Sequence, residues 1–116
     1  MKIHYLEYVT NDVNALCATF EATHGVSFGE PDAPLGGART TALHEGGMLG
    51  IRAPLSESET PIVRAYTLVD DIEAATAQAA DAGAVVALPP TEIQGHGTCA
   101  ILIQGGVQSG LWQRQA

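Results

Sequence analysis

Ionisable and aromatic residues recur at alternate positions of segments that have the two-residue period of β-strands. Tyr5 and Glu7 share one face of the segment 3–9, and Arg64 and Tyr66 share one face of the segment 62–69. Arg52 and Trp112 lie in two further β-like segments. A carboxylate can act as a general base, a guanidinium binds anions, and aromatic rings stack on flat ligands. These residues are therefore the candidate ligand-binding residues, with Glu7 as the candidate catalytic base.

The sequence shows no recognisable spacing of metal ligands. The four histidines are His4, His24, His44 and His96, and no two are closely spaced. Cys17 and Cys99 lie in no metal-ligand spacing and are expected to be buried thiols. His44 and His96 are close to predicted turns, so a displaced metal site that combines one of them with Glu7 stays open.

The elements that must position these residues follow from the periodicity. In the first half the sequence predicts a strand over 3–9, followed by a helix with an apolar stripe that begins after Asn11 and Asp12 and ends near Gly25. His4 is expected on the side of the strand that faces this helix. Short strands are predicted over 39–44 and 48–53, with a turn at 45–47 between them. The segment 54–61 has no periodicity and is expected to be a linker.

The second half repeats this order. A strand over 62–69 precedes Asp70 and Asp71, which are expected to cap a helix from Ile72 to about Ala82, before Gly83. Strands are then predicted over 85–88, 98–103 and 109–113, interrupted by turns at Pro89-Pro90 and at 94–97. Superposing the halves places Asp12 on Asp71. The sequence thus predicts one domain, with module one over about 1–54 and module two over about 62–116.

One module is too small to bury its own sheet, so two must pair, within one chain or between swapped chains. This predicts an α+β fold in which two βαβββ modules form a curved mixed sheet around a cavity, with helices on the convex face. Leu6, Tyr8 and Val69 would pack against the helices. The residues expected to face the cavity are Tyr5, Glu7, Arg64, Tyr66 and Leu68.

Composition limits the partners. The chain has 116 residues, 46% of them hydrophobic, and a net charge of -8, which disfavours nucleic acid as a partner. It has no apolar run long enough for a secretory signal or a membrane-spanning helix. We therefore expect a cytoplasmic protein that contacts no membrane.

The order of these segments resembles the vicinal oxygen chelate superfamily, which includes glyoxalase I, extradiol dioxygenases and the bleomycin-resistance proteins. The resemblance is carried by LEYVTNDVNALCATFEATHGV in the first module, and by YTLVDDIEAATAQAADAGAVV and GHGTCAILIQGGVQSGLWQ in the second. The usual Asp-Pro-x-Gly turn before the last strand is replaced by Ile103-Gln104-Gly105-Gly106.

The resemblance also implies where metal ligands would lie. Metal-dependent members place two His, Glu or Gln ligands in each module, and the matching positions here are Tyr5, Gly50, Arg64 and Gly110. Tyrosine is a poor ligand for such a site at neutral pH, arginine repels a divalent cation and glycine has no donor. We therefore expect no metal at this site and no other cofactor.

Three functions fit these expectations. The first is binding of a small, partly aromatic or anionic molecule in a metal-free cavity, as a homodimer like the bleomycin-resistance proteins that the chain resembles. The second is a metal-independent isomerase, epimerase or lyase, with Glu7 as base and Arg64 or a tyrosine stabilising an enolate. The third is a non-catalytic dimeric interaction module. An ion pair between Arg64 and Glu7, and plain core packing of Trp112, are alternatives to ligand contacts for those residues.

Overall fold

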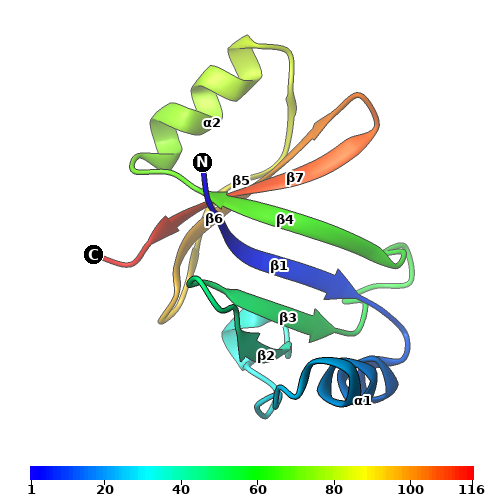
Figure 1. Cartoon of the computed structure of the whole chain (residues 1–116). Helices are drawn as coiled ribbons and strands as arrows, with labels where there is room; N and C mark the ends of the chain where they lie inside the picture. Colours follow the sequence, from blue (N-terminus) through cyan, green and yellow to red (C-terminus); the bar gives the residue numbers. More distant parts are fainter. The chain divides into compact units, whose positions relative to one another are not determined.

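The protein is an α+β structure of two compact units. The computed structural model describes residues 1–116, and Figure 1 shows its helices and strands. One unit is Tyr5–Val63, and the other combines Met1–His4 with Arg64–Ala116. We refer to them below as module one and module two. Each contains one α-helix and a mixed set of strands, as the sequence predicts.

Module one contains β1 (Ile3–Val9, from Tyr5 onwards), α1 (Val13–His24), β2 (Arg39–Ala42) and β3 (Met48–Arg52). Strand β3 lies between the other two, parallel to β1 and antiparallel to β2. Helix α1 ends at Gly25, which has a φ of 67° and donates its N–H to the Glu21 carbonyl. The core of the module is formed by Cys17, Phe28, Leu49 and Ile51, with Leu6, Tyr8 and Phe20 packed against it. The predicted helix-facing positions of β1 at Leu6 and Tyr8 are therefore confirmed.

The segment between α1 and β2 has little regular structure. It contains only the short 3-10 helix η1 (Ala33–Leu35) and an isolated bridge between Asp32 and Ala38. The Gly29 N–H donates to the Thr40 carbonyl at 2.9 Å, so this segment also covers part of the outer edge of β2. No apolar periodicity marks these contacts in the sequence, because they are made by backbone groups.

Module two contains most of β4 (Ile62–Leu68), α2 (Ile72–Asp81), β5 (Val85–Ile93), β6 (Gly97–Gln104) and β7 (Val107–Arg114). Its strands follow the order β4-β7-β6-β5, with β4 and β7 parallel and the other pairs antiparallel. The β6–β7 ladder is regular over its whole length, from Gly97 opposite Arg114 to Gln104 opposite Val107.

Strand β5 corrects one expectation. The prediction ended this strand at Leu88 because Pro89 and Pro90 follow, but the strand continues to Ile93. Its register against β6 shifts between Val86 and Leu88 and again between Leu88 and Thr91. Because β5 is at the end of the strand order, it has an outer edge, and proline is tolerated at edges and bulges where it need not donate a ladder hydrogen bond.

The two helices begin differently although both follow an Asp. The Asp71 side chain accepts the Ala74 N–H at 3.1 Å, as a capping residue should. Asp12 occupies the same position before α1, but its side chain makes no capping bond. The predicted cap is thus confirmed for α2, whereas for α1 only its position is confirmed. Neither helix has the length and apolar character needed to span a bilayer.

Candidate functional site

In module one the inward-facing charges form a network of one guanidinium and two carboxylates. Arg52 Nε donates to Glu7 Oε2 at 2.8 Å. The Nη1 and Nη2 atoms of Arg52 donate to Glu59 Oε1 and Oε2, each at 2.8 Å. Glu59 Oε1 also accepts the Leu55 N–H at 2.7 Å, which ties the segment after β3 to the end of that strand. The structure therefore brings the candidate residues Glu7 and Arg52 into direct contact.

This network is buried, which decides its electrostatics. Glu7 is 5% exposed and Arg52 is 6% exposed. The hydrogen bonds with Glu59 raise the pKa of Arg52 above its ordinary value, burial opposes this effect, and the contact with Glu7 adds to it. The guanidinium is thus held in its charged form by two carboxylates, which makes the network a structural ion cluster.

Tyr5 fills the space that a side chain at residue 50 would need. An ideal Cβ placed on Gly50 would overlap the Tyr5 hydroxyl and ring. Tyr5 itself is 2% exposed. Burial, followed by the negative charge of Glu7, raises the pKa of Tyr5 well above its ordinary value. The phenol is therefore neutral, and it occupies the volume where the resemblance would place metal ligands.

In module two the corresponding face carries a guanidinium that donates to side-chain oxygens of Gln108 and Tyr66. Arg64 Nε and Nη2 both donate to Gln108 Oε1, at 3.1 Å and 2.7 Å, and Nη1 donates to the Tyr66 hydroxyl at 3.3 Å. Arg64 is only 4% exposed, whereas Gln108 is half-buried near the start of β7. One amide oxygen therefore receives two donors of the guanidinium fork.

Aromatic side chains complete this face. The Tyr66 ring covers Gly110, where an added Cβ would overlap it. Tyr66 and Trp112 meet edge to face, with ring centroids 5.6 Å apart. Trp112 is 1% exposed, and its Nε1 donates to the His96 carbonyl at 3.0 Å. The packing alternative for Trp112 therefore describes its state in this structure.

The four positions that the resemblance matches to metal ligands have different neighbours in the two modules. Tyr5 meets Gly50 in module one. In module two Gly110 is covered by Tyr66, its register partner, while Arg64 bonds to Gln108. Glycine at both strand positions is needed for the same reason, which is close approach of an aromatic ring.

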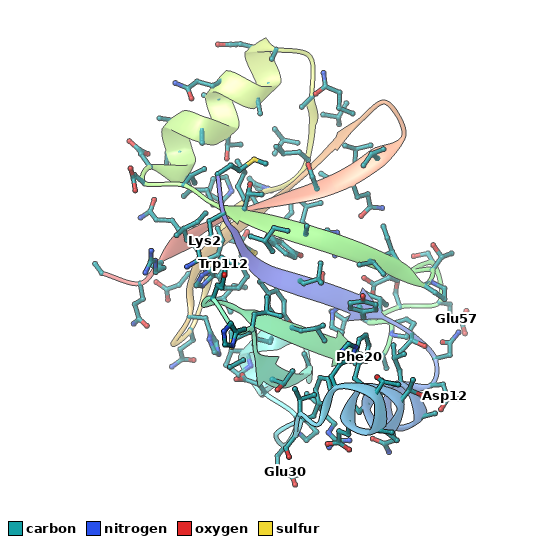
Figure 2. All side chains as sticks on the ribbon, viewed as in Figure 1. Lys2, Asp12, Phe20, Glu30, Glu57 and Trp112 are labelled. Carbon is teal, nitrogen blue, oxygen red and sulfur yellow. The ribbon has the colours of Figure 1, made fainter.

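The histidines are not gathered into a metal site. No group of three or more His, Cys, Asp or Glu side chains is placed to hold a metal ion. His24 and His44 lie at an apolar pocket of about 360 Å³ in module one, beside Tyr8 and Phe20. Figure 2 labels Phe20 on α1. His4 was expected on the helix-facing side of β1, and its ring centroid lies 5.6 Å from that of Trp112. The expected face of His4 stays a prediction, and the adjacent Lys2 carbonyl accepts the Leu68 N–H.

Two residues of these networks were missed by the sequence reasoning. Glu59 lies in the segment expected to be a linker, and Gln108 follows the Gly105-Gly106 turn. Glu59 belongs to no periodic pattern, whereas Gln108 shares the face of Gly110 and Trp112 but lies just before the strand that the sequence predicts over 109–113. The available signal was the presence of two arginines in strand segments, since a buried guanidinium needs acceptors that the strand itself does not supply.

Comparison with solved structures identifies the fold of this chain. No family model and no curated protein matches the sequence. Among solved structures, a hypothetical protein from Bacillus halodurans C-125 matches with a TM-score of 0.75 and 16% identity, over 99% of this chain and 95% of that one. Methylmalonyl-CoA epimerase from Mycobacterium tuberculosis matches with a TM-score of 0.75 and 15% identity, over 98% and 88%. The chain has the vicinal oxygen chelate fold.

A further match carries a ligand. A variant of Streptomyces coelicolor methylmalonyl-CoA epimerase in complex with 2-nitronate-propionyl-CoA has a TM-score of 0.70 and 18% identity, over 100% of this chain and 99% of that one. At these sequence identities the similarity shows a shared fold only. The chemistry of this chain has to be argued from its own residues.

Proposed function

We propose that this chain is a glyoxalase-like or bleomycin-resistance-like protein that binds a small, partly aromatic or anionic molecule without a metal. Module two supplies the contacts, with Arg64 binding the anionic group. The observation that carries the proposal is the fork of Arg64, whose Nε and Nη2 atoms both donate to the single Oε1 atom of Gln108. A carboxylate or phosphate offers one oxygen to each donor and forms the stronger, charge-assisted pair.

Access to Arg64 depends on Gln108. Because Arg64 is 4% exposed, the half-buried Gln108 side chain has to move before a ligand can take its place in the fork. Gln108 lies near the start of β7, next to the Gly105-Gly106 turn, where a half-buried side chain has more room to change rotamer than in the middle of a strand. Tyr66 and Trp112 then offer apolar and aromatic surface next to the anionic group.

The test is a thermal-shift screen with small aromatic and aliphatic carboxylates. A ligand at 100 times its dissociation constant adds about 2.7 kcal/mol to the free energy of unfolding, so binders raise the melting temperature clearly. In Gln108→Glu the new carboxylate would pair with Arg64 and compete with the ligand. We expect this variant to keep its fold and lose the ligand-induced shift, whereas Arg39→Met in module one keeps it. An undiminished shift in Gln108→Glu would remove Arg64 from the ligand site.

A second candidate function is proton abstraction next to a carbonyl, which is supported by the likeness to methylmalonyl-CoA epimerases. Glu7 would take the proton α to the carbonyl and return it, and a guanidinium or tyrosine would stabilise the enolate oxygen. Glu7 is in contact with Arg52 at 2.8 Å, so its carboxylate must leave that contact to reach a substrate.

Deuterium exchange tests this candidate directly. The chain is incubated with methylmalonyl-CoA in deuterated buffer, and deuterium at the α-carbon is followed by mass spectrometry. If Glu7 is the base, exchange occurs and Glu7→Gln abolishes it. Absence of exchange in the unaltered protein would exclude this candidate and leave the binding function standing.

The homodimer and the cytoplasmic location stay predictions from the resemblance and the composition. Light scattering on a sizing column checks the first. If the protein is a monomer at the concentrations used for binding, it differs in this respect from the dimeric resistance proteins. A monomer would also disfavour the interaction-module alternative.

A further inference from the structure

Basic side chains gather around the single tryptophan at the end of β7. The His4 ring lies against the Trp112 ring, and the Trp112 indole donates to the His96 carbonyl. The Lys2 carbonyl accepts the N–H of Leu68, which is the register partner of Trp112. Lys2 and Trp112 are labelled in Figure 2. Arg114 follows Trp112 by two positions on β7, so its side chain leaves the same face of the strand. We name Lys2, His4, His96 and Arg114 the basic cluster.

The charges of the basic cluster are unusual for this chain, which has 13 acidic and only 5 Lys and Arg residues. Arg39, Arg52 and Arg64 all donate to oxygens of neighbouring residues. The side chains of Lys2 and Arg114 make no hydrogen bond and no ion pair, and both are exposed. The two basic side chains without partners are therefore found at the same place.

The pKa of His4 reflects the positive charges around it. Burial lowers the pKa of His4, and the charges of Arg114, Lys2 and His96 lower it further. The cluster thus repels an additional proton in the absence of an anion. An anion bound there would offset this repulsion and favour protonated His4.

A polar groove next to Arg114 provides space. It has a volume of about 370 Å³, and Arg114 is the member of the basic cluster that lines it, together with Gln94, Thr98, Gln113 and Gln115. Glu92 lines the same groove, and Asp70 lines a second groove that Arg114 also borders. Neither carboxylate forms an ion pair with Arg114.

We propose that the basic cluster is a second anion site, which binds the phosphate groups of a small soluble phosphoester. Several separate cations at one place suit a group with more than one negative charge and several acceptor oxygens, and a single carboxylate would use only part of them. The net charge of -8 opposes binding to nucleic acid or to an anionic membrane. Trp112 borders both faces, but the cations of the basic cluster do not include Arg64, so this proposal does not depend on the function proposed above.

Fluorescence of Trp112 reports on this site, because it is the only tryptophan. The probe is inorganic pyrophosphate, titrated at an ionic strength of roughly 0.01 M, where screening is weak. We expect saturable binding that is about tenfold weaker in Arg114→Ala, since a charge-assisted hydrogen bond contributes that much. Arg39→Ala makes the same change in net charge in module one and should bind like the unaltered protein. Equal affinities for the unaltered protein and Arg114→Ala would overturn the proposal, as would equal losses in the two variants.

Two further arms separate the alternatives. The Arg64→Met variant should still bind pyrophosphate. Loss of binding in this variant would mean that pyrophosphate binds at the Arg64 fork and that the second site does not exist. Vesicles of phosphatidylcholine containing phosphatidic acid should not bind the protein. Binding to these vesicles without binding to pyrophosphate would overturn the soluble ligand in favour of a lipid headgroup.

The pH dependence gives a readout that a purely structural role would not change. Binding should be tighter at pH 6 than at pH 8, because the anion favours protonated His4 among the charges of Lys2, His96 and Arg114. In His4→Gln part of this dependence should disappear. The change in the charge of pyrophosphate is common to both proteins, so an unchanged dependence in His4→Gln would remove His4 from the site.

Discussion

The two modules place a glycine at the same strand position and cover it with a tyrosine, but they treat the neighbouring arginine differently. In module one Tyr5 covers Gly50, and in module two Tyr66 covers Gly110. Arg52 is bound by the carboxylates of Glu7 and Glu59, whereas Arg64 donates to the neutral oxygens of Gln108 and Tyr66. A repeated fold can thus keep one packing solution while its two copies take different electrostatic roles.

The difference supports the proposal that the ligand binds at the face of module two. A guanidinium between two carboxylates already has the strong partners that an anionic ligand would offer. A guanidinium held by an amide oxygen gains by exchanging it for a carboxylate.

The largest effect is expected from removing the arginine of module one. Arg52→Met takes the guanidinium partner from buried Glu7 and should lower the free energy of unfolding by about 3–5 kcal/mol. Arg64→Met removes the hydrogen bonds to Gln108 and Tyr66 and should cost about 1–2 kcal/mol. Urea denaturation of both variants measures the two losses, and equal losses would contradict the contrast between the modules.

A smaller effect is expected from filling the glycine positions. Gly110→Val would force the Tyr66 ring out of its place and should cost about 1–3 kcal/mol. In a Tyr66→Ala background the ring is absent, so most of this penalty should vanish. The same cycle with Gly50→Val and Tyr5→Ala tests module one, again by urea denaturation. Additive losses in either cycle would show that the ring is not what requires the glycine.

The smallest effect is a pH dependence that belongs to module one. The pKa of Tyr5 is raised in the folded protein by burial and by Glu7, whereas an unfolded tyrosine ionises near pH 10. A folded pKa above the unfolded value gives stability that is complete below about pH 10 and is lost as the pH rises further. Tyr5→Phe should remove this alkaline loss, as followed by denaturation at increasing pH. An unchanged alkaline loss in Tyr5→Phe would assign it to another group.

Much of the fold could be predicted because its signals are local. The Asp before each helix, the apolar stripe of α1 and Gly25 after it identify the first strand–helix unit, and the repeat identifies the second. The continuation of β5 through Pro89 and Pro90 could not be predicted, because proline is acceptable only at an edge and the sequence does not say which strand is at the edge.

The sequence predicted several residues of the candidate site but not the hydrogen bonds that connect them to their partners. Alternation places Tyr5 with Glu7, and Arg64 with Tyr66, on common strand faces. It does not reveal that Glu59 returns from an irregular segment to Arg52, or that Gln108 receives two donors of Arg64. Glu59 comes from a segment without periodicity, and Gln108 lies on a strand distant in sequence from Arg64, so only the path of the backbone brings them to the arginines.

The sequence by itself determined the α+β class, the repeated strand–helix units and the absence of ligating side chains at Tyr5, Gly50, Arg64 and Gly110. These follow from residue type and spacing, which are properties of neighbouring positions. The tertiary structure decided that tyrosine rings fill the places of Gly50 and Gly110, which arginine has carboxylate partners, and that Lys2 and His4 join Trp112 and Arg114. Those contacts join residues far apart in the chain, and their energies depend on burial and distance that only the folded chain defines.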